Sequence, residues 1–451
     1  MTLLADLAAL LGDRGCLVGG DVPESCRSDE SGTGTTLPRA LLRPATLEQI
    51  SGALALCHAA GQAVVPQGGM TGLAGGAHAG PAEIALSLSR FSGIEDLDPV
   101  SRTVTVRAGT VLEQVQTACA EAGLLFPVDF GARGSCQIGG VIATNAGGLR
   151  VLRYGTTRQN VLGLEMIRAD GTVLSHLNRA TKDNTGLDLR GLAVGSEGIL
   201  GVITRAVFRL APLPGESHTA LCALPSPEAA VGFLNKARGL RGLSAFEAMW
   251  PCYLGVNCRL EGRRFFDDLP PMAVLIEADE PLEPLLEDCF GDLVQDALIA
   301  RSLAEARQFW DVREGHRLNG AMPGLLNFDV SMAPGEMPDF VARARARIAA
   351  LYPQAPALFF GHLGDGNLHI LIHLPELPPD LALHQMDAIV YDEIRRIGGS
   401  ISAEHGIGTL KRDWLDHSRK PEEIQTMRGI RRIFDPKGIM NPGKVFATAR
   451  T

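Results

Sequence analysis

Four residues in the last quarter of the chain have the types and spacing of a metal site. His362 and His369 flank the tetrapeptide GDGN within GHLGDGNLHILIH (361–373), between two apolar runs. A glycine-containing turn of this kind joins neighbouring strands, and such a hairpin can bring two imidazoles together on one side. Further on, the segment ISAEHGIG supplies Glu404 and His405. Two histidines and a carboxylate are typical ligands of an open divalent-metal site that leaves positions for substrate.

A plainer interpretation is that these histidines form hydrogen bonds within a polar turn. That alternative suits a single histidine better than a set of four polar residues. His373 follows His369 by four residues on the same expected strand, about 13 Å away at ~3.3 Å per residue. The two cannot share one metal ion, and we expect His373 to be structural.

Three glycine-rich segments in the first half of the chain could hold a large, phosphate-bearing ligand. They read PQGGMTGLAGGA (66–77), DFGARGSCQIGGVIATNAGGLRVLRYG (129–155) and KDNTGLDLRGLAVGSEGILGVIT (182–204). Bare backbone N–H groups in such segments can approach a ligand closely, and a short apolar run before Pro66 followed by Thr71 suits a pyrophosphate cradle. Neither of the first two segments is a GxGxxG motif that opens a helix, which disfavours a Rossmann site. The alternative is that these are glycine-rich surface loops.

The elements that position the glycine-rich segments alternate between strands and helices. Thr46 and Gln49 predict the capped start of a helix with an apolar face. That face consists of Ile50, Ala53, Leu54 and Cys57. Alternating residues at 84–89 and 103–107 predict half-buried strands.

The histidine motif belongs to a second part of the chain. LAPLPGE (210–216) is the best linker candidate, because two prolines and a glycine follow a long strand pattern. Beyond it, strands and helices alternate, which predicts an antiparallel sheet backed by helices. The expected strands lie near 219–224, 245–250, 272–278 and 327–332, and the expected helices near 227–239, 281–294 and 303–321. The predicted domains are 1–212, 213–420 and a helical segment at 421–451.

Composition excludes several classes of function. The net charge is −9 with no run of lysine or arginine, which argues against nucleic acid as a partner. The N-terminal residues are expected to form a short amphipathic helix and not a signal peptide. No apolar run approaches the ~20 residues of a spanning helix. Nine cysteines without a CxxC motif predict reduced thiols in a cytoplasmic protein.

The order of the glycine-rich motifs resembles the FAD-binding domain of the vanillyl-alcohol-oxidase-type flavoproteins. The chain is similar in particular to the D-2-hydroxyacid dehydrogenases, most of all to the D-2-hydroxyglutarate dehydrogenases, from about Leu41 to Val445. The resemblance implies an α+β fold with a two-part FAD-binding domain, an antiparallel-sheet substrate (cap) domain and a C-terminal segment that returns to the flavin domain. Some members link flavin through a histidine where this chain has Met70, so non-covalent FAD is implied.

The cofactor contacts implied by the resemblance come from all three glycine-rich segments and from the C-terminal tail. Cys136, inside the second segment, is expected to be a small group that lets the backbone approach the cofactor, with a redox role as the alternative. The expected cofactor-binding residues are Pro66, Gly68, Gly69, Met70, Thr71, Gly72, Gly75, Gly76, Gly134, Ser135, Cys136, Ile138, Gly139, Gly140, Thr144, Asn145, Gly148, Tyr154, Gly155, Glu197, Gly198, Ile203 and Asn441.

The resemblance also assigns roles at the metal site. It implies that His362, His369 and Glu404 bind a divalent metal, with zinc the first candidate and manganese or cobalt also suitable. His405 is the expected catalytic base, since histidine titrates near neutral pH, or else it orients substrate by hydrogen bonding. Asn367 is expected to donate to a substrate oxygen, or simply to hold the turn.

Recognition of the substrate carboxylate is implied for Arg313, in the helix QFWDVREGHRLNG. The sequence departs from the hydroxyglutarate pattern at Asn327, where that branch has a lysine that contacts substrate. Arg317, one helical turn from Arg313 and expected on the same face, is our candidate for the missing positive charge. If it does not supply that charge, the substrate is smaller or less acidic, such as D-lactate.

The predicted function is oxidation of a D-2-hydroxy acid to the 2-oxo acid with hydride transfer to flavin N5. D-2-hydroxyglutarate is the leading substrate, and D-lactate or another D-2-hydroxy acid is the alternative. A metal-dependent hydrolase with structural glycine loops and a flavoprotein that only carries its cofactor are the rivals from other classes. The expected electron acceptor is an electron-transfer flavoprotein or a quinone, and a homodimer is possible.

Overall fold

The computed structural model describes residues 2–375 and 379–447, and its contacts divide the chain into two compact units. The first comprises Met1–Gly148, Tyr154–Leu213 and Glu404–Thr451, and the second comprises Leu149–Arg153 and Pro214–Ala403. The boundary at Leu213 falls inside the expected linker. The grouping differs from the predicted domain ranges, which placed 404–420 with the substrate domain. Among the helices in the described ranges, none is long and apolar enough to cross a membrane.

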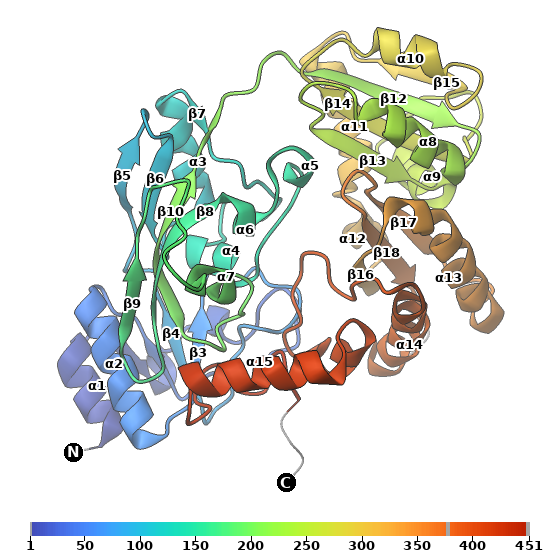
Figure 1. The fold of residues 1–451 in the computed structure, drawn as a ribbon. Helices are drawn as coiled ribbons and strands as arrows, with labels where there is room; N and C mark the ends of the chain where they lie inside the picture. The colour runs from blue at the N-terminus through green and yellow to red at the C-terminus, as the bar shows by residue number, and fades with distance from the viewer. Residues whose placement is uncertain (1, 376–378, 448–451) are drawn as a thin grey trace. The chain divides into compact units, whose positions relative to one another are not determined.

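Two main sheets form the first unit (Figure 1). The smaller has the order β1-β2-β4-β3, in which β4 runs parallel to both β2 and β3. The larger is antiparallel, with the order β5-β6-β10-β8-β9, and a further pair joins β7 to β11. The strands are β1 (Cys16–Val18), β2 (Ala40–Leu42), β3 (Val64–Gln67), β4 (Ile84–Ser87), β5 (Ile94–Asp98), β6 (Thr103–Arg107), β7 (Leu124–Leu125), β8 (Val161–Ile167), β9 (Val173–His176), β10 (Val202–Arg209) and β11 (Ala211–Pro212).

Helix α2 begins where its capping residues predict. The Thr46 side chain accepts a hydrogen bond from the Gln49 backbone N–H, and the buried residues of the helix are the four predicted ones. The C-terminal segment is helical as expected. The helices are α1 (Leu3–Leu11), α2 (Leu47–Ala60), α3 (Leu112–Glu121), α4 (Ile138–Ala143), α5 (Val151–Tyr154), which spans a boundary between the units, α6 (Thr157–Asn160), α7 (Leu189–Ala193) and α15 (Pro421–Phe434).

The prediction that strands β4 and β6 are half-buried was wrong. On β4, Ile84 and Leu86 pack into the core beneath α1 and α2, while Ala85 packs into a second cluster on the opposite face with Val22. Strand β6 is likewise buried from Thr103 to Val106. Residues of both strands are buried on both faces of their sheets, so neither face is left to solvent.

The second unit is one antiparallel sheet backed by helices, as predicted, and the helices lie on both of its faces. Its seven strands have the order β15-β12-β14-β13-β17-β18-β16. They are β12 (His218–Leu224), β13 (Ala245–Met249), β14 (Met272–Ala278), β15 (Asp296–Ile299), β16 (Leu325–Ser331), β17 (Ala357–His362) and β18 (Asn367–His373). The helices are α8 (Pro227–Ala237), α9 (Pro251–Leu260), α10 (Glu283–Cys289), α11 (Leu303–Glu314), α12 (Leu318–Ala321), α13 (Met337–Leu351) and α14 (Pro379–Ile397).

The two faces of this sheet are covered by different helices. Helices α9 and α11 pack on one face, where Phe309 of α11 joins a core cluster with Leu275 of β14. Helices α8, α13 and α14 lie against the other face, where Phe233 of α8 contacts Phe246 of β13. Because residues two apart on a strand share a face, the α9–α11 face continues from this apolar cluster to the polar residues of the histidine hairpin.

The single helix predicted at 303–321 was wrong in one respect that matters for the site. Helix α11 ends at Glu314, because Gly315 adopts a left-handed conformation with φ of 62° and its N–H bonds back to Asp311. The chain then turns before α12. Arg313 and Arg317 therefore do not share a helix face.

Candidate functional site

The first unit contains a cavity of about 430 Å³ whose wall is built from the glycine-rich segments. Its volume lies in the range of ligand and cofactor pockets, ~300–1,000 Å³. Most of the expected cofactor-binding residues line it. They are Pro66, Gly68, Gly69, Met70, Thr71, Gly72, Gly76, Cys136, Gly139, Gly140, Thr144, Gly148, Glu197, Gly198, Ile203 and Asn441.

The remaining expected residues do not line this cavity, and their contact with the cofactor stays a prediction. They are Gly75, Gly134, Ser135, Ile138, Asn145, Tyr154 and Gly155. Two of them have contacts within the protein: Asn145 Oδ1 accepts from the Arg158 backbone N–H, and Gly75 lies against the Thr409 side chain. Asp29 and Phe130 also line the cavity, although the glycine pattern of the sequence did not predict them.

At some positions of the cavity wall the backbone approaches other backbone closely. A Cβ at Gly69 would lie 2.0 Å from the Ser135 carbonyl oxygen, so only glycine fits there. Three non-glycine residues in the wall have positive φ: Met70 at 58°, Glu197 at 49° and Asn441 at 41°. Such conformations are costly and cluster at ligand sites. The wall is therefore shaped to bring backbone close to a ligand.

Asn441 supplies a polar atom that has no partner within the described residues. Its Nδ2 donates to the carbonyl oxygens of Gly76 at 3.1 Å and Glu197 at 2.7 Å. Its Oδ1 is buried and accepts no hydrogen bond from the described part of the chain. A buried, unpaired acceptor calls for a donor from a ligand. Together with the glycine wall, it makes the cavity fit a flavin dinucleotide.

The ionisable residues that line the cavity are acidic or neutral. They are Asp29, Cys136, Glu197, Glu404 and His405, and no lysine or arginine lines it within the described ranges. A pyrophosphate group would therefore be held by backbone N–H groups, as the glycine pattern predicts. Burial raises the pKa of the Glu197 carboxyl, although it accepts from the Ile407 and Gly408 N–H groups.

Cys136 has the properties of a packing residue. Its thiol is buried in the wall, and burial raises its pKa to about 12. The thiolate is the nucleophilic and redox-active form, so the structure favours the packing role over the redox alternative.

The histidine motif forms the predicted hairpin at one end of the seven-stranded sheet. Strands β17 and β18 pair antiparallel, with Phe360 opposite His369. His362 and His369 lie on the same face, and their ring centroids are 5.5 Å apart. His373 is remote from them, and its Nε2–H donates to the Pro323 carbonyl oxygen at 3.1 Å. This is the structural role expected for it.

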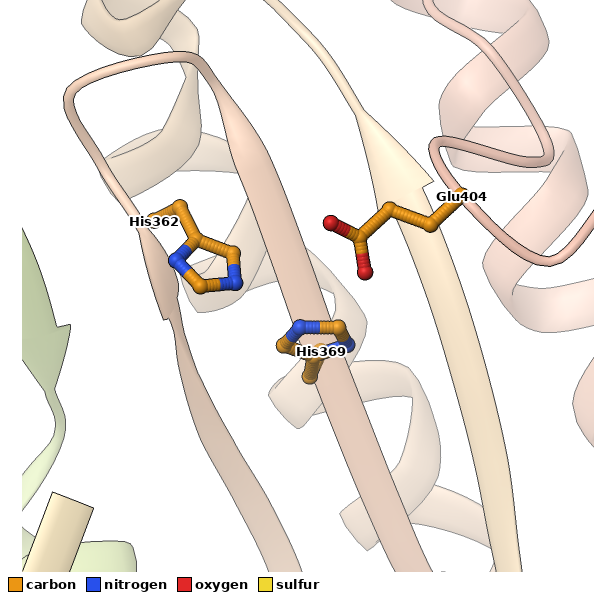
Figure 2. Close-up of side chains that lie close together, drawn as sticks. All are labelled: His362, His369 and Glu404. Carbon is orange, nitrogen blue, oxygen red and sulfur yellow. The ribbon is translucent and has the colours of Figure 1, made fainter. Parts of the chain in front are cut away.

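The residue before Glu404 in the chain anchors it next to the two histidines. The backbone N–H of Ala403 donates to the Asp329 carboxylate on β16 at 3.1 Å, and Glu404 follows directly. One ligand atom from each of His362, His369 and Glu404 lies within 4.8 Å of the others. Figure 2 shows the Glu404 carboxylate next to the His369 ring, with one ring nitrogen of His362 turned toward both.

This donor set fits a divalent metal. An ion bound at ~2.1 Å keeps its ligand atoms within about 4 Å of one another, and two imidazoles with one carboxylate suit zinc and other first-row metals. Asp329, Glu404 and His405 form a second group with the same spacing. His405 thus lies within reach of Glu404, a candidate metal ligand, and also lines the cavity.

Glu247 is a site residue that sequence analysis missed. It lies on β13 opposite His362, and its Oε1 is 2.9 Å from His362 Nδ1. Its Oε2 accepts from Arg313 Nε at 2.7 Å. Burial alone would raise the pKa of this carboxyl, but the charges of Arg313 and His362 outweigh burial and hold it at about 2. Glu247 is the single carboxylate of β13, whose five residues are all buried, and this could have signalled a partner.

The expected substrate-binding residues are only partly brought together. Asn367 is buried on the histidine face, and neither its Oδ1 nor its Nδ2 has a hydrogen-bond partner among the described residues. Arg313 is buried, but Glu247 occupies its Nε. Arg317 is exposed and pairs with Glu261 at 3.1 Å, so the expectation that it lies beside Arg313 was wrong. Asn327 is exposed on β16.

The fold and motifs match known proteins over most of the chain. A family model for an FAD binding domain matches residues 38–176, and one for the C-terminal domain of FAD linked oxidases matches residues 213–445. The D-2-hydroxyglutarate dehydrogenase of Xanthomonas citri pv. viticola is 40% identical over 92% of this chain and 90% of that protein. A putative mitochondrial D-lactate dehydrogenase of Schizosaccharomyces pombe is 37% identical over 89% of this chain and 81% of that protein.

Solved structures agree on the fold. The structure of p-cresol methylhydroxylase with substrate bound covers 100% of this chain and 97% of its own, with a TM-score of 0.78 and 17% sequence identity. Identity at that level carries the fold and not the activity. These matches confirm the resemblance and the α+β fold class predicted from the motifs. The chain belongs to the FAD-linked oxidase family of vanillyl-alcohol-oxidase type, alongside the D-2-hydroxyacid dehydrogenases that its motifs resemble.

Proposed function

We propose that this protein is an FAD- and divalent-metal-dependent dehydrogenase that oxidises D-2-hydroxyglutarate to the 2-oxo acid. The similarity to D-2-hydroxyglutarate dehydrogenases over most of the chain supports the substrate. The observation that carries the site is the buried amide of Asn367, which has no hydrogen-bond partner in the described part of the chain and lies two residues from His369 on the same strand face. A buried amide without partners marks a place where a polar ligand is missing.

The cofactors would supply the two halves of the oxidation. When bound, flavin would supply the hydride acceptor at N5, and a divalent ion, with zinc the first candidate, would supply a charge that lowers the pKa of the substrate hydroxyl. His362, His369 and Glu404 would hold the ion. The cavity wall would hold the flavin without a covalent bond, since Met70 offers no linking nitrogen.

The chain's own side chains would orient the substrate and move its proton. Asn367 donates from Nδ2 to a substrate oxygen and satisfies the group that is unpaired in the protein alone. His405 accepts the hydroxyl proton at an imidazole nitrogen, which suits its place next to the ligand Glu404 and in the cavity wall. The electrons then pass to an electron-transfer flavoprotein or a quinone.

D-lactate, or another D-2-hydroxy acid with one carboxylate, is the second candidate substrate. Two observations favour it. Asn327 is neutral where the hydroxyglutarate branch has lysine, and Arg317 is bound to Glu261 at the surface. The distal carboxylate of D-2-hydroxyglutarate would then lack the positive charge expected from the sequence. The family match does not support the hydrolase alternative.

The test is anaerobic mixing of the flavin-loaded protein with each acid while the visible flavin absorbance is followed. Rapid bleaching by D-2-hydroxyglutarate, with slower or no bleaching by D-lactate and the L-isomers, is expected. Bleaching by D-lactate alone keeps the reaction and changes the substrate. A protein that acquires no flavin absorbance in excess FAD contradicts the proposal.

A further inference from the structure

Three buried side chains in the second unit form a hydrogen-bonded chain that ends at a candidate metal ligand. Arg313, Glu247 and His362 are 4%, 2% and 6% exposed, and Glu247 bonds to both of the others. A buried ion pair loses most of its Coulomb energy to desolvation and is weak evidence of stabilisation by itself. The arrangement therefore needs another explanation.

The geometry of this chain is fixed from several sides. The β13–β17 register places Glu247 directly opposite His362. The Arg313 guanidinium lies 4.9 Å from the centre of the Phe360 ring, and its own carbonyl oxygen accepts from the Tyr253 hydroxyl at 2.7 Å. Neither partner of Glu247 can move far without breaking one of these contacts.

The hydrogen bond to Glu247 selects one tautomer of His362. A carboxylate paired with arginine can only accept, so the hydrogen it receives must sit on His362 Nδ1. The lone pair of a neutral ring is then on Nε2, the nitrogen that Figure 2 shows turned toward His369 and Glu404. For His369 the carboxylate of Asp329 lies 4.0 Å from Nδ1, too far for a hydrogen bond.

We propose that Glu247 is a positioning residue that holds His362 in the tautomer and orientation required to bind the metal, with Arg313 as its counter-ion. The inference rests on the proposed metal-dependent function and adds to it a residue that never touches the ion. It also gives Arg313 a task other than gripping the substrate carboxylate.

Glu247→Gln tests this with almost no change of shape. An amide cannot accept from both Arg313 and His362 Nδ1: if its NH₂ faces His362, the ring must carry its hydrogen on Nε2, where it blocks the metal. We expect the affinity of the apo-protein for Zn²⁺ alone, measured in competition with a chromogenic chelator, to fall ten- to a hundredfold, the usual effect of losing such a partner.

A matched control lies on the same face of the same sheet. Glu277 on β14 accepts from Trp310 of α11 and from Thr219, and is not bonded to either histidine. Glu277→Gln should leave the Zn²⁺ affinity within about twofold. An equal loss in both variants would assign the effect to general loosening of the sheet and would overturn the inference.

A double variant keeps the test decisive if Glu247→Gln folds poorly, because that change leaves Arg313 charged and buried. Glu247→Gln with Arg313→Gln removes both charges. Weak Zn²⁺ binding in the folded double variant supports positioning of His362 by Glu247, whereas wild-type affinity overturns it. A wild-type protein that binds no Zn²⁺ would refute the metal site itself; tight binding unchanged by Glu247→Gln would refute only the inference.

Discussion

The cavity wall of the first unit and the polar end of the sheet in the second unit are built on opposite principles. The wall presents backbone, with glycine at close approaches such as Gly69 and strained residues such as Met70. The sheet end presents side chains that three strands and a helix bring together: Glu247, His362, His369 and Arg313. The difference teaches that a large cofactor can be held by local chain conformation, whereas a metal needs residues from distant parts of the sequence.

Removing a metal ligand should give the largest effect and confine it to the sheet end. We expect His369→Ala to lower turnover about a thousandfold or more, because an open metal site that loses one of three ligands no longer holds its ion. Bound flavin, measured by absorbance, should be retained. The control is His373→Ala on the same strand, which should keep its metal; equal loss of metal in both would contradict the separation.

A side chain added where the cavity wall approaches other backbone should have the opposite effect: flavin is lost and metal binding is kept. In Gly69→Ala the new Cβ would lie 2.0 Å from the Ser135 carbonyl oxygen, so we expect about 3 kcal/mol of destabilisation and loss of bound FAD. Zn²⁺ affinity should stay near that of wild type. Gly80→Ala, in the same loop but 3.7 Å from its nearest neighbour, is the control. Normal flavin content in Gly69→Ala would break the account of the wall.

In the first unit, the buried carboxylate of Glu165 forms an ion pair with the partly buried Arg205. The contribution of this pair to stability should depend on pH. Burial would raise the pKa of Glu165, but its bonds to Arg205 and Thr204 outweigh burial and lower it. A carboxyl whose pKa is lowered by folding stabilises the protein at pH values above its pKa in the unfolded state, ~4.3. That stabilisation is lost as the pH falls through the pKa of the folded state.

Glu165→Gln should therefore cost about 2 kcal/mol of unfolding free energy at pH 7 and less as the pH falls below ~4. Denaturant unfolding at pH 7 and at a pH below ~4 checks this. Zn²⁺ affinity should not change, unlike in Glu247→Gln, because Glu165 contacts no histidine in the hydrogen bonds that the structure describes. A cost that grows on acidification would contradict the assigned direction of the pKa.

The smallest effect is expected at Arg317. Its side chain is 65% exposed and pairs with Glu261, and exposed pairs contribute ~0–1 kcal/mol. Arg317→Ala should leave KM for D-2-hydroxyglutarate within about twofold. A tenfold rise with unchanged KM for D-lactate would restore Arg317 as the contact of the distal carboxylate.

The same contrast explains how much could be predicted from the sequence. The glycine-rich segments and the β17–β18 hairpin are local, so their chemistry could be identified from neighbouring residues. Glu247 lies 115 residues from His362 and 66 from Arg313, and only strand pairing brings them together. The end of α11 was predictable in principle, since Gly315 is a typical helix terminator. Because the helix was predicted to continue past Gly315, Arg317 was wrongly expected on the same face as Arg313.

The burial of β4 and β6 could not be deduced from their own residues. The alternation of residue types suggested that one face of each strand is exposed to solvent. That face is instead covered by residues from other parts of the chain, as Ala85 is by Val22. The elements were predicted correctly and their environment was not, because environment depends on which neighbours the topology supplies.

We propose that the metal and the flavin are held separately and that both are needed for oxidation. The most direct test of this proposal uses flavin-loaded protein from which metal has been removed by a chelator, mixed anaerobically with whichever D-2-hydroxy acid bleaches the untreated protein. We predict that the flavin stays bound and oxidised until Zn²⁺ is added, and then bleaches. Bleaching at the full rate without metal would contradict the account.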